Sequence, residues 1–372
     1  GCVTDKKSPS FAFSVDSDRQ GAKLKRAVIA VEDWKLTTTQ QTAIVYDGKP
    51  LEPFRTYTAK LTVWDDADDM AQAELKFETG RKDTPWLAKW ITDGDYHFTE
   101  KKISPVPMTF KKSFSVDKKI KSAKIYATAM GIYELSLNGS KVGNQFFAPG
   151  FTSYKTRLQY QTYDVTEMMQ SRPKELSILA GDGWYKSRIP FEGSSVGFYG
   201  NDYRVLAELH IEYADGSKEV LSTDESWQVR RSNITFSGIY DGEWQDETLP
   251  QGEVEAVAIA TPLKGQLIDR LSVPVRTHEE FHPALVSNDA GETILDIGQN
   301  LAGIFTLRVH IPKGQRVHIQ AGEVLQDGHF YRDNLRTAKA EFYYTSDGEE
   351  HIVRPHFTFY GFRYLKIEGI EN

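Results

Sequence analysis

Acidic side chains gather in residues 240–247, which read YDGEWQDE. The carboxyl groups there belong to Asp241, Glu243, Asp246 and Glu247, and Asp182 in the stretch GDGWY is a further candidate. Two facing carboxyl groups can act as general acid and general base. Acids between strands, however, more often cap turns or stay in water. The pattern therefore predicts no catalytic pair in this chain.

Aromatic residues with polar neighbours form the second group that could do chemistry. A sugar site places an aromatic face against the apolar side of the ring and a few polar groups against its hydroxyls. The residues predicted to form such a site, in loops together with Phe198, are Trp184, Tyr185, Tyr199, Asn201, Asp202 and Trp244. The alternative is that these aromatic side chains pack in a core or between domains.

Metal and cofactor chemistry finds little support. His278 and His282 are four residues apart in HEEFH, a spacing that suits a metal on a helix, but Pro283 and the strand-like surroundings favour a loop. His351 and His356 are expected at the surface or in hydrogen bonds. One cysteine permits no thiol pair, and the glycine-containing turns precede no helix that could cradle phosphate. No cofactor is predicted.

Length and charge narrow the remaining possibilities. A chain of 372 residues is long enough for two or three domains, and three is the working number. The formal charge of -7, without a block of Lys and Arg, argues against nucleic acid as a partner. No apolar run approaches the roughly twenty residues of a membrane-spanning helix.

Cys2, the only cysteine, follows Gly1 and precedes the polar stretch VTDKKSPS. This arrangement is typical of the processed start of a bacterial lipoprotein, in which the thiol carries lipid and the polar stretch serves as a tether. The alternative is an unmodified thiol after a cloning remnant. The first interpretation predicts an exported protein, periplasmic or at the cell surface of a bacterium, that reaches the membrane only through a lipid anchor.

Strand patterns dominate the chain, and helix patterns are scarce beyond a turn or two in VTEMMQS. In TYTAKLTV, Tyr57, Ala59, Leu61 and Val63 share one face, as in a half-buried strand. The sequence predicts an all-β protein of three consecutive β-sandwich domains. They are a fibronectin III-like sandwich at residues 1–80, a lectin-like jelly roll at 81–265, and a further sandwich at 266–372.

Two turn dipeptides help to define the second domain. In YELSLNGSKVG, Tyr133, Leu135 and Leu137 alternate with polar residues, and Asn138-Gly139 suits a two-residue hairpin turn. Asp215-Gly216 is expected to repeat that turn. In the third domain, TLRVHI alternates in the same way, so one of its faces is expected to be wet.

The order and spacing of several stretches resemble the non-catalytic front portion of bacterial α-L-rhamnosidases. The similarity runs through nearly the whole chain, and its pieces gain specificity from their order. The stretches are FETG with WLAKWI, YELSLNGSKVG, FAPGFTSYKTRLQYQTYDVT, GDGWY, YDGEWQDE, DIGQNLAGIFTLRV, GEVLQDGHFYRDNLRTA and PHFTFYGFRYLKIEG.

The resemblance implies an inverting enzyme that removes terminal L-rhamnose from plant glycans or glycosides. Its acid and base lie in an (α/α)6 barrel that begins after the GFRYLKIEG strand, so this chain is expected to lack the barrel, to have no catalytic residue and to be inactive alone. Related rhamnose-binding modules hold calcium with an Asp-Asn pair, for which this chain has Met130 and Gly131. Calcium needs oxygen ligands, so no metal site is expected.

Two hypotheses about function follow. The first is an accessory, structural part of a rhamnosidase acting on rhamnose-containing glycans, whose third domain packs against the barrel. Aromatic residues that could form that docking face, or the sandwich's own core, are Phe330, Tyr331, Tyr343, Phe357, Phe359 and Tyr360. The second is a stand-alone carbohydrate-binding lipoprotein at the cell surface.

Overall fold

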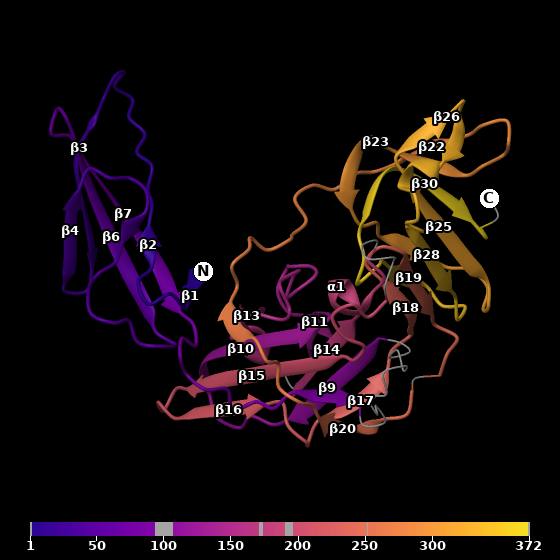
Figure 1. The fold of residues 1–372 in the computed structure, drawn as a ribbon, viewed down its shortest axis with the longest axis horizontal. Coiled ribbons are helices and arrows are strands. Elements are labelled where there is room, and N and C mark those ends of the chain that lie inside the picture. The colour runs from indigo at the N-terminus through magenta and orange to yellow at the C-terminus, as the bar shows by residue number, and fades with distance from the viewer. Residues whose placement is uncertain (1, 94–106, 171–173, 190–195, 251, 371–372) are drawn as a thin grey trace. The chain divides into compact units, whose positions relative to one another are not determined.

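The computed structural model describes residues 2–93, 107–170, 174–189, 196–250 and 252–370 (Figure 1). Strands account for nearly all regular structure there. The described helices are single turns: α1 (Gly183–Lys186), η1 (Met168–Gln170) and η2 (Asp333–Leu335). The all-β prediction is confirmed, and η1 lies in the VTEMMQS stretch, of which Ser171 is outside the described residues.

The chain forms two compact units, one of Gly1–Trp86 with Ile268–Leu271 and one of Leu87–Leu267 with Ser272–Asn372. In the first unit, a five-stranded sheet has the order β1-β7-β6-β3-β4, and β2 pairs with β5. The strands are β1 (Cys2–Thr4), β2 (Ser10–Phe11), β3 (Leu24–Val31), β4 (Trp34–Thr38), β5 (Ile44–Val45), β6 (Thr56–Asp65) and β7 (Met70–Thr79).

The core of the first unit follows the predicted alternation. Tyr57, Ala59 and Val63 of β6 are buried, whereas Lys60 between them is exposed. The stretch after Cys2 was expected to be a tether, but its first residues form strand β1. This strand pairs in parallel with β7 and places Cys2 opposite Phe77. The Asp5 N–H then donates to Asp269 Oδ2 at 2.8 Å. Backbone pairing thus extends to the residues next to Cys2, a contact that polarity alone did not indicate.

A 12-stranded sheet in the second unit has the order β12-β11-β14-β9-β17-β20-β8-β15-β10-β13-β21, with β16 paired to β15. The strands are β8 (Ile91–Asp93), β9 (Met108–Phe114), β10 (Ile120–Met130), β11 (Ile132–Leu137), β12 (Ser140–Lys141), β13 (Arg157–Asp164), β14 (Lys174–Gly181), β15 (Arg204–Tyr213), β16 (Lys218–Ser222), β17 (Gln228–Arg231), β20 (Glu255–Ile259) and β21 (Gln266–Asp269). Leu135 and Ile178 share one buried cluster with Ala127 and Leu209, so the two halves of this sheet face each other across a core.

The two predicted hairpin turns differ. Asn138 and Gly139 have φ of 52° and 76°, and Leu137 pairs with Ser140, which confirms the two-residue turn. The turn at Asp215-Gly216 is longer, because Glu212 pairs with Lys218 and only Gly216 has positive φ. The Tyr213 N–H donates to the Ser217 carbonyl oxygen at 2.9 Å, so the loop has three residues and does not repeat the two-residue turn.

A seven-stranded sheet, in the order β18-β19-β28-β25-β30-β23-β22, completes the second unit beside the pairs β24-β29 and β26-β27 (Figure 1). The strands are β18 (Ile234–Gly238), β19 (Gly242–Asp246), β22 (Ala284–Val286), β23 (Ile294–Gly303), β24 (Leu307–Val309), β25 (Arg316–Gly322), β26 (Val324–Gln326), β27 (His329–Tyr331), β28 (Glu341–Thr345), β29 (His351–Val353) and β30 (Tyr360–Glu368). In and after β24, Arg308 and His310 are exposed and Val309 is buried, which confirms one wet face.

The acidic stretch lies within this sheet and not in a loop. β19 runs parallel to β28, with Trp244 opposite Tyr343. Strand β19 precedes the predicted domain limit at 265, yet it pairs with β28, which follows that limit, and β18 joins the same sheet through β19. Parallel pairing of strands so distant in sequence leaves no local pattern, and the sequence-based division could not include it.

Candidate functional site

Most of the predicted sugar-binding aromatic residues meet in one cluster of the second unit. The Tyr199 ring centroid lies 4.9 Å from that of Tyr154 and 6.3 Å from that of Phe151. Phe151 lies 6.1 Å from Trp184, and Tyr154 lies 5.3 Å from Tyr185. These residues, with Phe198, are called the aromatic cluster below. Phe151 and Tyr154, in FAPGFTSY, were not predicted for this site.

The aromatic cluster has a buried base and an open edge. Tyr154 and Tyr185 are buried, whereas Phe151 and Phe198 are 55% and 45% exposed. Gly200 lets the loop lie on Tyr185, because a Cβ there would come within 2.0 Å of the Tyr185 hydroxyl oxygen. Trp184 is partly buried and packs against the cluster of Ile132, Phe147, Ile234 and Phe357. The open edge suits stacking on a sugar ring, and Trp184 also serves packing.

The two predicted polar residues differ in availability. Asp202 is 3% exposed, and its Oδ2 accepts from Arg204 Nε at 2.5 Å, so this carboxylate is already neutralised. Asn201 Oδ1 is buried and accepts no hydrogen bond from the described residues. It faces Gly197, where a Cβ would lie 1.7 Å from it. Asp202 is engaged in this ion pair, whereas Asn201 retains acceptor capacity, and sugar binding by either residue stays a prediction.

Trp244 lies apart from the aromatic cluster, in strand β19, and the prediction of a loop was wrong for it. Its ring centroid is 4.7 Å from that of Phe236 and 5.5 Å from that of Tyr343. The alternation in GEWQD that indicates a strand is only five residues long, and the surrounding acids and glycines suggested a turn.

The acids of residues 240–247 have partners of their own. Arg188 Nε donates to Asp241 Oδ2 at 2.9 Å. Asp246 Oδ1 accepts from the Thr248 N–H at 2.9 Å, and Glu247 Oε1 accepts from Asn233 Nδ2 at 2.7 Å. These hydrogen bonds tie the three carboxylates to neighbouring turns and loops.

Glu243 is fully buried and joins β19 to the segment before β30. Its carboxylate accepts from the backbone N–H of His356 at 3.0 Å and of Phe357 at 2.8 Å. Gln245 Nε2 donates to its Oε1 at 2.7 Å. Burial raises the pKa of this carboxyl, against the lowering effects of the His356 charge and these hydrogen bonds.

Glu134 of β11 faces the same segment. Both of its oxygens accept from Arg354 Nη2 at 2.8 Å, and His356 Nδ1 lies 2.9 Å from Oε2. Burial alone would raise the pKa of Glu134. The hydrogen bond from His356 and the charges of His356, Arg354 and Lys141 outweigh it and lower this pKa to about 2. Glu134 and Glu243 thus hold residues 354–357, here called the junction segment, from two sheets.

Apolar packing completes this junction. Phe357 is 1% exposed and fills the space that Gly181 leaves, since a Cβ at Gly181 would lie 2.3 Å from the Phe357 ring. Of the residues considered for docking, Tyr360 is also buried, whereas Phe359 is 39% exposed and packs 5.6 Å from Phe147. Phe330, Tyr331 and Tyr343 are half-buried, and a docking face there stays a prediction.

Asp182 belongs to another buried network. Lys186 Nζ donates to Asp182 Oδ1 at 2.9 Å and to the Tyr203 hydroxyl at 3.0 Å. Burial raises the pKa of Asp182, against the opposing charge of Lys186. Lys186 is 2% exposed, and the network lies under α1. The three groups satisfy one another and anchor the GDGWY turn.

Met130 and Gly131 stand where related modules hold calcium with an Asp-Asn pair, and neither residue has a side-chain oxygen. The space around residue 131 also excludes a larger side chain. Met130 is buried, and Gly131 has φ of 110° with its missing Cβ 2.4 Å from the Gly181 carbonyl oxygen. An oxygen-bearing side chain at residue 131 would collide with that strand. Among the described residues, no group of three His, Cys, Asp or Glu could hold a metal. His278 and His282 lie exposed in irregular backbone.

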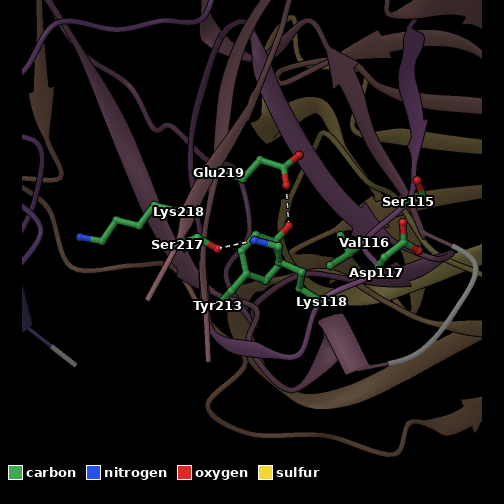
Figure 2. Close-up of a pocket in the computed structure, with 8 residues that line it drawn as sticks. All are labelled: Ser115, Val116, Asp117, Lys118, Tyr213, Ser217, Lys218 and Glu219. Carbon is green, nitrogen blue, oxygen red and sulfur yellow. Dashed lines mark hydrogen bonds between the residues drawn. The ribbon is translucent and has the colours of Figure 1, made fainter. Parts of the chain in front are cut away.

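One pocket lies between the β9–β10 connection and the β15–β16 hairpin (Figure 2). Its lining residues are Ser115, Val116, Asp117, Lys118, Tyr213, Ser217, Lys218 and Glu219. The Tyr213 hydroxyl donates to Glu219 Oε2 at 2.5 Å, and Lys118 Nζ lies 3.0 Å from Asp215 Oδ2. Lys118 Nζ also donates to Ser217 Oγ at 2.8 Å, so Tyr213, Glu219, Lys118 and Ser217 are engaged within the protein. Among the described helices, none has the length and apolar character to cross a membrane.

Three family models match successive parts of the chain. They are the Rha78A-like N-terminal immunoglobulin domain at residues 1–83, the α-L-rhamnosidase N-terminal domain at 118–279, and the bacterial α-L-rhamnosidase concanavalin-like domain at 287–372. The immunoglobulin and concanavalin-like domains are β-sandwiches, in agreement with the predicted fold class.

Curated relatives and solved structures agree with these models. An α-L-rhamnosidase of Alteromonas is 30% identical over 366 residues, 91% of this chain and 39% of the relative. One of Streptomyces avermitilis is 36% identical over 68% of this chain and 26% of its own length. The crystal structure of the Aspergillus terreus α-L-rhamnosidase matches with a TM-score of 0.89 and 29% identity, over 98% of this chain and 45% of that one. The chain therefore spans less than half the length of these relatives.

Proposed function

Because the chain belongs to the α-L-rhamnosidase family through the three domains that it spans, we propose that it is the non-catalytic front portion of such an enzyme. The observation that carries this proposal is the extent of the similarity, 91% of this chain but 39% of the Alteromonas relative. The parent enzyme would remove terminal α-L-rhamnose from glycans by inversion, and this portion would support its catalytic barrel.

The arrangement of carboxylates supports a structural role. An inverting glycosidase needs an acid and a base about 6.5–9.5 Å apart with room for water between them. Here Glu243 is fully buried under backbone N–H donors, and Glu134 is bound by Arg354 and His356. Neither carboxylate is free to activate water or to protonate a leaving oxygen.

The gene beyond the codon for Asn372 provides the test. The longer product is expected to hydrolyse p-nitrophenyl α-L-rhamnoside, with the 372-residue chain as its matched control. Removing residues 1–372 from the longer product is expected to lower its yield of folded enzyme. A stop codon directly after Asn372 would contradict the accessory role. The same conclusion would follow if the deletion left the yield of folded enzyme and the rate of hydrolysis unchanged.

A second candidate function is a stand-alone carbohydrate-binding lipoprotein, exported to the periplasm or the cell surface and anchored through lipid on Cys2. The open edge of the aromatic cluster, with Phe151 and Phe198 exposed, is the observation that favours it. A glycan array, followed by calorimetry with L-rhamnose with and without calcium, tests the binding. Mass spectrometry of Cys2 in the natively expressed protein tests the anchor, and an unmodified thiol would exclude it.

A further inference from the structure

Strand β7 (Met70–Thr79) in the first unit has a neighbour along only part of the side that faces away from β6 (Figure 1). β6 pairs with β7 over nearly its whole length, whereas β1 pairs with it only from Phe77 to Thr79. In the part of the chain that the structure describes, no strand pairs with residues 70–76 on that outer side. These residues are all exposed. Most of β7 is therefore a free sheet edge.

The hydrogen-bond pattern of the β6–β7 hairpin shows which backbone groups point to this edge. The Asp65 N–H donates to the Asp69 carbonyl oxygen at 3.0 Å, so these two residues form a hydrogen-bonded pair. Such pairs alternate with non-bonded pairs along an antiparallel ladder, and Ala73 is again in a bonded position toward β6. Gln72 and Glu74, on either side of Ala73, therefore direct their N–H and C=O groups to the free edge.

An apolar row lies beside these backbone groups. Ala71, Ala73 and Leu75 share the face of β7 that carries Phe77 into the core, because side chains alternate along a strand. Phe77 is 4% exposed and belongs to the core cluster of the first unit. Leu75, in contrast, is 49% exposed, and both alanines are exposed. The core-side row of β7 is thus covered at one end and open at the other.

The devices that usually protect an edge strand are missing from β7. Natural sheets blunt their edges with proline, a bulge or a charged side chain on the core face. β7 contains no proline, and its register with β6 has no shift. Its charged residues, Glu74 and Lys76, lie on the face opposite the apolar row. The other edge strand of this sheet, β4, is shorter, and Trp34 and Leu36 in it are half-buried. The unprotected edge is that of β7.

We propose that β7 pairs with β7 of a second copy of this chain, antiparallel and about a two-fold axis at Ala73. In this register Gln72 lies opposite Glu74 of the second copy, so the backbone groups that point to the free edge bond to each other. Ala73 lies opposite itself in a non-bonded pair, where the strands approach most closely and a small side chain fits. The apolar rows of the two copies join, with Ala71 opposite Leu75.

The charges of β7 favour this register and a second copy as the partner. With the axis at Ala73, Lys76 lies opposite Met70, and no like charges meet. Moving the axis to Glu74 would place two carboxylates opposite each other, which destabilises a strand pair. Moving it to Gln72 would leave Leu75 and Lys76 beyond the free-edge residues of the second copy. The free edge is therefore complementary to itself, as a closed two-fold contact requires. This proposal does not rest on the proposed function.

Sedimentation velocity of the 372-residue chain between about 1 and about 100 µM tests the association, since a contact of this small size is expected to be weak. The mean mass should rise from 42.2 kDa toward twice that value. Gln72→Pro removes an N–H that bonds to nothing within the unit, a position where an edge strand accepts proline. It should weaken the association about tenfold or more and leave the melting temperature of the monomer unchanged. Gln72→Ala keeps the N–H and is the matched control.

Two cysteine variants, both with Cys2→Ser, test the register. In Ala73→Cys the two residues should lie about 4.5 Å apart between Cα atoms, which permits a disulfide between copies. In Leu75→Cys they should lie about 13 Å apart, because each is four residues from the position opposite the other. Oxidation should therefore link copies of Ala73→Cys into a covalent dimer and leave Leu75→Cys monomeric on a non-reducing gel.

A mass of 42.2 kDa at every concentration would overturn the proposal, and so would association that Gln72→Pro leaves unchanged. Equal linkage of the two cysteine variants, or none in Ala73→Cys, would remove the two-fold register. Masses that grow beyond the dimer would instead indicate head-to-tail pairing of β7 with β4 of the next copy. If Gln72→Pro fails to fold, the two cysteine variants decide the question alone.

Discussion

Glu134 and Glu243 hold the same junction segment from two sheets, but they do so with different partners. Glu134 binds the Arg354 guanidinium and the His356 ring, and its pKa falls to about 2. Glu243 binds backbone N–H groups in a fully buried place, and its pKa rises. A carboxylate bound by cations stays charged at neutral pH at little cost, whereas one bound by neutral donors retains much of its desolvation penalty. Neither arrangement suits proton transfer to a substrate.

Removing the Glu243 carboxylate should have the largest effect. In Glu243→Ala, the N–H groups of His356 and Phe357 would stay buried without an acceptor, at a cost of about 4 kcal/mol in the free energy of unfolding. Urea unfolding of the chain measures this loss. The control is Glu253→Ala, at an exposed position, with an expected change of about 0.5 kcal/mol or less. Equal stability of the two variants would show that Glu243 does not hold the junction.

Glu134→Gln should rank second, with a loss of about 3 kcal/mol at pH 7, because Arg354 would keep its charge without a counter-charge. The same urea titration measures it. Replacing Arg354 by Met in the Glu134→Gln background removes the unpaired cation and should restore part of the loss. A single variant as stable as the parent would show that the ion pair contributes nothing net.

The two carboxylates should also respond to pH in opposite directions. The pKa of Glu134 is lowered from 4.5 to about 2, so its contribution is complete above pH 4.5 and disappears as the pH falls toward 2. The stability gap between the parent and Glu134→Gln should therefore narrow on acidification. The pKa of Glu243 is raised above 4.5, so ionisation destabilises the fold as the pH rises past that value.

The gap between the parent and Glu243→Gln should accordingly narrow with rising pH. Unfolding curves between pH 2 and pH 8 for the parent and both glutamine variants measure these trends. Parallel curves for the two variants would refute the distinction between charged and neutral partners.

Lys141→Ala should have the smallest effect at the junction. Lys141 Nζ lies 3.7 Å from Glu134 Oε1 and 3.9 Å from the centroid of the Phe146 ring, and its side chain is 28% exposed. Partly solvated contacts of this kind contribute about 0.5 kcal/mol. Thermal unfolding should detect a small decrease at most. A loss as large as that of Glu134→Gln would make Lys141 an essential partner.

The sequence predicted the strands well where local pattern determines them. Alternation in TYTAKLTV and the Asn138-Gly139 dipeptide identify a half-buried strand and a tight turn, because each depends on neighbours along the chain. Pairing between distant residues was not predicted. The parallel pairing of β19 with β28 moved Trp244 from an expected loop into a sheet, and the pairing of β1 with β7 replaced an expected tether.

The candidate site was predicted in part for the same reason. Trp184, Tyr185 and Tyr199 belong to one cluster, but the rings that join them are Phe151 and Tyr154. These two come from a stretch that entered the sequence analysis only through the family resemblance. The ion pair of Asp202 with Arg204, two residues later, was not predicted, and a role for Asp202 in sugar binding stays a prediction.

Hydrolysis by the isolated chain tests most directly whether its carboxylates serve structure and not catalysis. Pure 372-residue protein, incubated with p-nitrophenyl α-L-rhamnoside at several protein concentrations, should release no nitrophenol above the buffer blank. Release that rises in proportion to the protein and disappears in Glu243→Gln or Glu134→Gln would contradict the account.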